Sequence, residues 1–200
     1  MQIIGEHLDL LLSKLFHDLI SPVSAARNGL ELVREFGGDD VGADALDLVA
    51  QSVDQANDRL TFFRMAFGGA GSSGSLAMHN VPDLAAGYLK SRKISADASN
   101  WTPGETRVGG AKVVLGGVAV AADFLPRGGQ IVLSADQGSA EIKAEGTGAA
   151  FSAPLFQALM QKVEPSTETV FATTVADNAS RFNVRIDAEQ VAPAIRFSWS

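Results

Sequence analysis

The sequence predicts an α+β protein in which two long N-terminal helices precede a smaller α/β sandwich. Three observations predict this class. Apolar side chains recur every three or four residues over 8–33 and again over 46–67, which is the spacing of helices in a bundle. The stretch GGAGSSGS at 68–75 is typical of a linker. Beyond it, short apolar strands and helices are mixed, which favours a two-layer sandwich.

Composition and charge narrow the function classes. The chain has 200 residues, 46% of them hydrophobic, and a net charge of −7 from 16 basic and 23 acidic residues. This charge opposes binding to nucleic acid or anionic lipid and favours protein partners. Without cysteine, disulfides and cysteine-ligated zinc are excluded. The longest apolar run, VVLGGVAVAADFL, falls short of the ~18 residues that span a bilayer. The N-terminus does not resemble a signal peptide, so we expect a cytoplasmic protein.

The apolar spacing of the first two helices predicts a dimer. After a break at GGDD, the second helix repeats the pattern of the first. A single antiparallel hairpin cannot cover both apolar faces, so we expect two copies to pair into a four-helix bundle. The positions concerned are Leu8, Leu12, Leu15, Leu19, Val23, Ala26, Leu30 and Val33 in the first helix, and Leu46, Val49, Val53, Ala56, Leu60, Phe63 and Phe67 in the second.

The second half of the chain predicts its own domain. We expect a hairpin domain at 1–69, a linker at 70–79 and a sandwich at 80–200. Helices are predicted near 82–91, 111–125, 152–163 and 168–182, and strands at QIVLSA, AEIKAE, NVRID and AIRFSW. Trp101 and Trp199 are expected to be core or edge residues of the sandwich.

His17 is the strongest candidate for a chemical role. At 100° per residue it points roughly 165° away from the centre of the apolar face, so it is predicted to face solvent. The same polar face carries Ser21, Ser24, Asn28, Glu31 and Glu35. Pro22 is expected to bend the helix beside the histidine. An exposed histidine is more often simply solvated, and we assign no function to His7 or His79.

Three longer stretches carry a family resemblance. FHDLISPVSAARNGLEL resembles the histidine-bearing helix of sensor histidine kinases, and more closely that of the ChpT-type histidine phosphotransferases of alphaproteobacteria. DRLTFFRMAFGGAG resembles the second helix of that family, and VVLGGVAVAADFLPRGGQIVLSA resembles its counterpart of the kinase ATP-binding domain. The resemblance implies a dimerising hairpin of the histidine kinase type (DHp-like), followed by a degenerate GHKL or Bergerat-type ATPase sandwich.

The resemblance also implies a function. Members of the family relay phosphoryl groups between receiver domains without using ATP, and His17 would be the phospho-accepting residue. A neutral imidazole is a good nucleophile near neutral pH. Asp18 would orient the ring, although adjacent helical residues do not face one another. The receiver would dock on Ser21, Ser24, Ala25 and Asn28 and supply Mg²⁺. The implied partners are the receiver of a hybrid histidine kinase and response regulators of the cell-cycle regulator type.

Two positions argue against ATP binding. The asparagine that holds Mg²⁺ in active kinases corresponds to Val120, which offers no ligand atom. The aspartate that binds adenine corresponds to Ala144, and Glu145 could replace it only after a shift of one residue. Gly146 and Gly148 are more simply explained as a tight turn, and the chain leaves no room for a lid before Ser152. We therefore expect no bound cofactor or metal.

Two other classes remain open at this point. An active histidine kinase or phosphatase would need a working nucleotide site. A protein-interaction module of the same fold would need no exposed histidine. Labelling from a phosphorylated receiver, and not from ATP, would distinguish a phosphotransferase from both.

Overall fold

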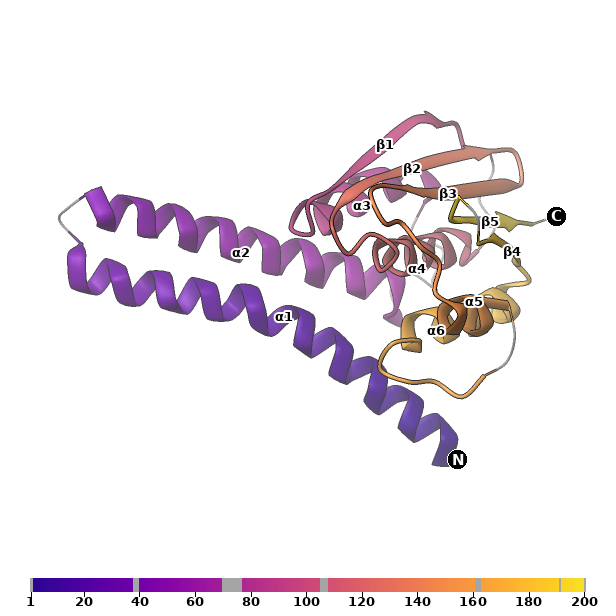
Figure 1. Ribbon diagram of the computed structural model, residues 1–200, viewed down its shortest axis with the longest axis horizontal. Coiled ribbons are helices and arrows are strands. Elements are labelled where there is room, and N and C mark those ends of the chain that lie inside the picture. Colours follow the sequence, from indigo (N-terminus) through magenta and orange to yellow (C-terminus); the bar gives the residue numbers. More distant parts are fainter. Residues whose placement is uncertain are drawn as a thin grey trace.

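Two long helices form a hairpin that projects from the rest of the chain (Figure 1). Helix α1 spans Gln2–Phe36 and α2 spans Asp40–Ala66. The computed structural model describes residues 2–37, 40–69, 77–104, 108–160, 163–190 and 192–199. Most of the predicted linker, residues 70–76, lies outside these ranges. The hairpin agrees with the predicted pair of helices, since each apolar period continues through one unbroken helix.

A five-stranded sheet with helices on one face makes up the second part (Figure 1). The strand order is β1-β2-β3-β5-β4. Strands β1 and β2 are parallel, and the other neighbours are antiparallel. The elements are the 3-10 helix η2 (Met78–Asn80), α3 (Val81–Lys90), β1 (Ile94–Trp101), α4 (Gly110–Ala122), β2 (Gly129–Asp136), β3 (Ser139–Glu145), α5 (Ala153–Met160), α6 (Val170–Phe182), β4 (Arg185–Glu189) and β5 (Ala194–Ser198). This arrangement agrees with the predicted mixture of helices and strands.

Helix α4 is the centre of the core. Each of its residues is buried, and it packs between the sheet and α6. Its glycine pair makes this packing possible. A Cβ at Gly116 would lie 2.6 Å from a methyl group of Val175, and one at Gly117 would lie 2.5 Å from the ring of Phe197. Glycine is therefore required where α4 meets both of its neighbours.

Strand β1 is the one element of the sheet that the sequence analysis did not predict. Its burial does not alternate cleanly, and half of its sequence ISADASNW is polar. Among the strands that the structure describes, it pairs only with β2, at the edge of the sheet. Trp101 ends this edge strand, and its indole N–H donates to the carbonyl of Met78 at 3.0 Å. Trp101 and Trp199 are both partly buried against the core, as predicted.

The hairpin and the sandwich share one apolar core. Phe62 of α2 stacks on Tyr88 of α3, with the ring centroids 4.0 Å apart, and Phe67 stacks on Phe171 of α6 at 4.6 Å. At the other end of the contact, His7 Nε2 of α1 lies 2.9 Å from Thr174 Oγ1 of α6. His7 therefore has a structural contact. The shared core fixes where α1 lies relative to the sandwich.

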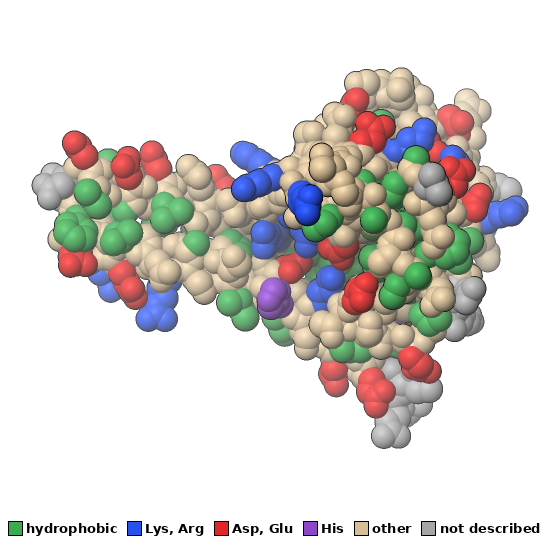
Figure 2. Space-filling view, in the orientation of Figure 1, with side chains coloured by type: hydrophobic (Ala, Val, Ile, Leu, Met, Phe, Trp, Pro, Cys, Tyr) green, Lys and Arg blue, Asp and Glu red, His purple; other side chains and the backbone are tan. Residues whose placement is uncertain are grey.

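The predicted apolar faces of the hairpin are only partly covered. Leu15 and Leu19 pack against the core, whereas other apolar side chains of the hairpin are exposed. Figure 2 shows hydrophobic side chains at the surface of the projecting hairpin. The exposed set comprises Leu8, Leu12, Phe16, Ile20, Val23, Leu30, Leu32, Phe36, Val41, Leu46, Leu48, Val53 and Leu60. In the described ranges, no helix is both long enough and apolar enough to cross a membrane.

Candidate functional site

His17 lies on α1 where the hairpin meets the sandwich, and its side chain is 88% exposed. This confirms the predicted direction of the side chain. Ser21, Ser24 and Asn28, further along the same face, are also exposed, and Ala25 is half-buried beside them. The structure therefore brings the histidine and the predicted docking residues onto one accessible surface of α1.

Asp18 faces the sandwich instead of solvent, and its side chain is only 16% exposed. One carboxylate oxygen, Oδ1, lies 3.5 Å from His17 Nδ1. The other, Oδ2, lies 3.5 Å from Arg92 Nη2. The side chains of His17 and Asp18 leave the helix in different directions, yet the Asp18 carboxylate still reaches the imidazole. Asp18 can therefore orient the His17 ring through one carboxylate oxygen while Arg92 holds the other.

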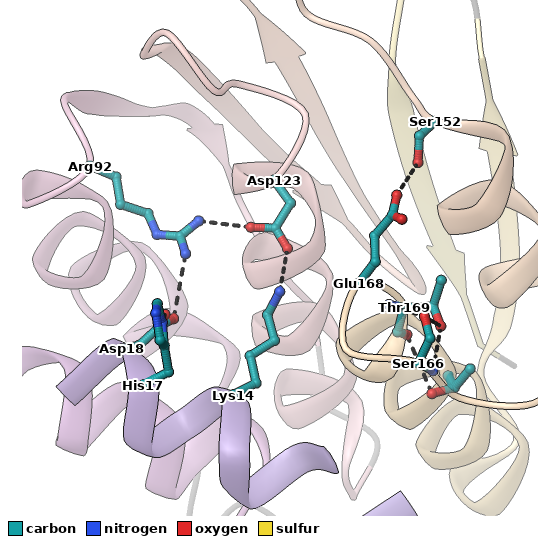
Figure 3. A network of polar contacts seen from close by, with 10 residues as sticks. Lys14, His17, Asp18, Arg92, Asp123, Ser152, Ser166, Glu168 and Thr169 are labelled. Carbon is teal, nitrogen blue, oxygen red and sulfur yellow. Dashed lines mark hydrogen bonds and ion pairs between the residues drawn. The ribbon is translucent and has the colours of Figure 1, made fainter. Parts of the chain in front are cut away.

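The contact with Arg92 belongs to a longer chain of alternating charges (Figure 3). Arg92 Nη1 lies 2.9 Å from Asp123 Oδ1, and Asp123 Oδ2 lies 3.1 Å from Lys14 Nζ. The four side chains come from α1, from the turn after α3 and from the end of α4. All of them are largely shielded from solvent, so their interactions are screened less than those of surface pairs. The network fixes Asp18 relative to the sandwich.

Arg92 also lies over the ring of Tyr88, 5.2 Å from its centroid. Burial alone would lower the pKa of Arg92, but the carboxylates of Asp123 and Asp18 raise it above its ordinary value. Burial raises the pKa of Tyr88, so its hydroxyl stays neutral. The side chain that holds Asp18 therefore remains a cation.

Lys14, Arg92 and Asp123 are not among the site residues that the sequence predicted. Arg92 and Asp18 are 74 positions apart, and no motif pairs them. A weak signal existed for Lys14, which precedes Asp18 by one helical turn and therefore lies on the same face. The network forms because the core places α3 and α4 beside α1, and sequence spacing contains no information about that contact.

Val120 and Ala144, the two positions that the sequence predicted for a degenerate nucleotide site, lie in the core. Val120 is fully buried in α4, and Ala144 of β3 is 5% exposed. Nearby, the rings of Phe124 and Phe151 meet edge to face with centroids 4.2 Å apart. Gly146 and Gly148 form a turn in which the amide of Ala149 bonds the Gly146 carbonyl at 3.1 Å. Within the residues that the structure describes, no group of three or more acidic or histidine side chains could hold a metal ion.

Comparisons with known proteins agree with this architecture. The protein phosphotransferase ChpT of Brucella abortus (strain 2308) is 35% identical over 127 residues, which make up 62% of this chain and 58% of that protein's length. A solved structure described as a bacterial phosphotransferase has the same fold. Its TM-score is 0.76 at 24% identity, and the alignment covers 96% of this chain and 95% of the other.

The family match covers the second part of the chain. Residues 78–194 match the model of the family described as histidine phosphotransferase C-terminal domain. The match begins after the hairpin that carries His17, while the structural likeness extends over both parts. Because the matched residues make up more than half of the sequence, the chain belongs to the histidine phosphotransferase family.

Proposed function

We propose that this protein relays phosphoryl groups between receiver domains through a phosphohistidine at His17, without ATP. One observation carries the proposal. An imidazole that is 88% exposed has one ring nitrogen 3.5 Å from a carboxylate, and that carboxylate is shielded from solvent and held by Arg92. A merely solvated histidine needs no such support. The family to which the chain belongs supports the same reaction class.

The contact with Asp18 suggests which ring nitrogen reacts. If Nδ1 carries the proton and faces Asp18 Oδ1, the lone pair of Nε2 is free to attack. The Nε2–P bond then forms as the bond between phosphorus and the donor's aspartyl oxygen breaks, and the donor carboxylate is regenerated. The Nδ1 proton remains in place, where Asp18 stabilises the positive charge of the phosphorylated ring. The reverse sequence on a second receiver completes the relay.

The receiver would supply the remaining charges. Phosphoryl transfer depends mainly on positioning and charge neutralisation. We propose that the Mg²⁺ and the acidic residues that bind it come from the receiver. Its docking surface would be Ser21, Ser24, Ala25 and Asn28, which continue from His17 along α1. The proposed partners are the receiver of a hybrid kinase and response regulators of the cell-cycle regulator type.

The buried apolar side chains of the sandwich support independence of ATP. Val120 and Ala144 offer no metal ligand and no adenine partner, and both are buried. The ring of Phe124 packs against the ring of Phe151, which lies in the segment between β3 and α5. The sandwich would instead act as a fixed support for Asp18, through Arg92 and Asp123.

The exposed apolar side chains of the hairpin support a homodimer. Leu46, Val53 and Leu60 recur every seven residues on α2, and each is more than half exposed. An apolar groove of about 400 Å³ runs between the two helices, with Leu12, Phe16 and Leu60 in its lining. A second copy that presents the same faces would cover both and complete a four-helix bundle.

The proposed activity is tested by following radiolabel from a phosphorylated receiver. The wild-type protein is expected to take label from the receiver and none from ATP with Mg²⁺. His17→Ala is expected to take none while its circular dichroism is unchanged, because an exposed side chain leaves no core cavity.

Label retained by His17→Ala would place the acceptor elsewhere and overturn the proposal. Label taken from ATP by the wild type would show an active kinase. His79→Ala is a control at a histidine with no proposed role, and it is expected to label as the wild type does.

A further inference from the structure

Pro22 leaves one backbone carbonyl of α1 without its usual partner. In an α-helix the amide of each residue donates to the carbonyl four residues earlier. Proline has no amide proton, so Pro22 cannot donate to the carbonyl of Asp18. Helix α1 nevertheless continues through Pro22, and it bends along its length (Figure 1). The unpaired carbonyl therefore lies next to the proposed phospho-acceptor.

Arg59 of α2 donates the missing hydrogen bond. Its Nη1 donates to the Asp18 carbonyl oxygen. The same guanidinium donates from Nε and Nη2 to Ser91 Oγ, at 3.3 and 2.9 Å. Ser91 caps the C-terminus of α3. One side chain thus connects α2, α3 and the carbonyl that Pro22 leaves free in α1.

The backbone carbonyl and the carboxylate of Asp18 are therefore both held at the C-terminal end of α3. Arg59, anchored on Ser91, holds the backbone carbonyl, and the adjacent Arg92 holds the carboxylate. A helix that has lost an internal hydrogen bond at a proline can flex there. Flexing at Asp18 would move the imidazole of His17 relative to a docked receiver.

We propose that Arg59 is a positioning residue for phosphoryl transfer, which replaces the hydrogen bond lost at Pro22 and so fixes the orientation of Asp18 and His17. This inference rests on the proposed function of His17. Arg59 is not proposed to touch the phosphoryl group. Its loss should therefore slow the transfer step and leave the affinity for the receiver unchanged, because the docking side chains of α1 are intact.

A double-mutant cycle tests the link between the two residues. Arg59→Met keeps the aliphatic stem and removes every donor. In the wild-type background it is expected to reduce the maximal rate of label transfer to His17 about tenfold. Pro22→Ala restores an amide that can donate to the Asp18 carbonyl. In that background, Arg59→Met is expected to cost less than about threefold.

Two further variants separate positioning from general damage. Arg59→Lys keeps one donor and should be slowed less than Arg59→Met. Arg185→Met makes the same kind of change at an exposed arginine of the edge strand β4 and should transfer at the wild-type rate. In each variant, the receiver concentration at half-maximal rate is expected to stay within about twofold of the wild-type value.

The unfolding equilibrium of the same four proteins of the cycle gives a readout that does not depend on phosphotransfer. Arg59→Met should raise the equilibrium constant of unfolding by a smaller factor in the Pro22→Ala background than in the wild-type background. Equal costs in both backgrounds, in rate and in stability, would overturn the inference. If none of the four proteins takes label at His17, the proposed function fails. If transfer occurs but the two substitutions are coupled only in unfolding, Arg59 stabilises the helix without positioning the phospho-acceptor, and the inference is overturned.

Discussion

Lys112 is a buried cation at the junction of the hairpin and the sandwich. Its side chain projects from α4, only 3% of the residue is exposed, and Nζ donates to the carbonyl of Gly68 at 2.5 Å. Burial lowers the pKa of Lys112 to about 8, with a further lowering from the charge of Arg181. The lysine thus connects the end of α2 to the core helix, and the strength of this connection depends on its protonation.

The pKa of Lys112 predicts how stability changes with pH. The folded-state pKa of about 8 lies below the ordinary value of 10.5, so between these values the unfolded state binds more protons. The contribution of this group to the free energy of unfolding therefore rises as the pH increases from about 8. Urea unfolding between pH 8 and 9.5, below the range in which tyrosine ionises, measures the slope.

The matched variant for this measurement is Lys112→Met, which keeps the length of the side chain. We expect its free energy of unfolding to rise less steeply with pH than that of the wild type over the same window. Identical slopes for the two proteins would contradict the lowered pKa. The comparison cancels the titration of groups that both proteins share, such as the α-amino group.

At the scale of one element, α1 presents different surfaces to different neighbours. Leu15 and Leu19 face the core, Asp18 and Lys14 face the sandwich, and His17 faces solvent. The helical period separates these roles, since residues one apart differ by 100°. A helix with this arrangement can be fixed on one side and remain accessible to a partner on another.

The accessible side of α1 predicts where a larger side chain would slow phosphoryl transfer. Ser24→Arg places a long side chain on the exposed face two turns from His17, where a receiver would pack closely. We expect transfer from a phosphorylated receiver to slow at least tenfold, or about 1.4 kcal/mol in transition-state free energy. Circular dichroism and oligomeric state should not change, because Ser24 makes no core contact.

Glu6→Arg is the matched control for this prediction. Glu6 is exposed on the same helical face but lies three turns from His17 in the other direction, toward the N-terminus. We expect a smaller effect than at Ser24. Equal losses at the two positions, or full activity of Ser24→Arg, would show that the receiver approaches from another direction. Ala25→Trp, next to Ser24 among the proposed docking residues, should behave like Ser24→Arg.

At the scale of the whole molecule, the hairpin is expected to be covered by a second copy. Val53 is 54% exposed on the face of α2 that also carries Leu46 and Leu60, so Val53→Asp would place a charge in the proposed dimer interface. We expect this variant to be a monomer in sedimentation equilibrium at a micromolar concentration at which the wild type is expected to be a dimer.

Leu48→Asp is the control for the dimer. Leu48 is 42% exposed on the same helix, but it precedes Val53 by five residues and therefore points to another side of α2. It is expected to leave the dimer intact. Monomers from both variants would indicate a general loss of structure, and a wild-type monomer would show that no second copy covers the face that carries Val53.

The sequence by itself determined much of the local structure. The apolar period predicted both helices of the hairpin, and the same period placed His17 on the exposed face, because the direction of a side chain on a helix depends only on its position in the chain. The apolar runs predicted α4, β2 and β3, and the glycine pair at 146 and 148 predicted a turn. Each of these features depends on interactions between residues close in sequence.

Only the tertiary structure decided which distant groups meet. Strand β1 alternates apolar and polar residues only over 94–99, and two of the three apolar residues there are alanine, so its own sequence gave a weak signal and its pairing with β2 decides it. Arg59 and Arg92 reach Asp18 from positions 41 and 74 residues away. Those contacts are set by how the shared core packs α2, α3 and α4 against α1. The phospho-acceptor candidate was therefore readable in the sequence, whereas the groups that hold it in place depend on long-range packing.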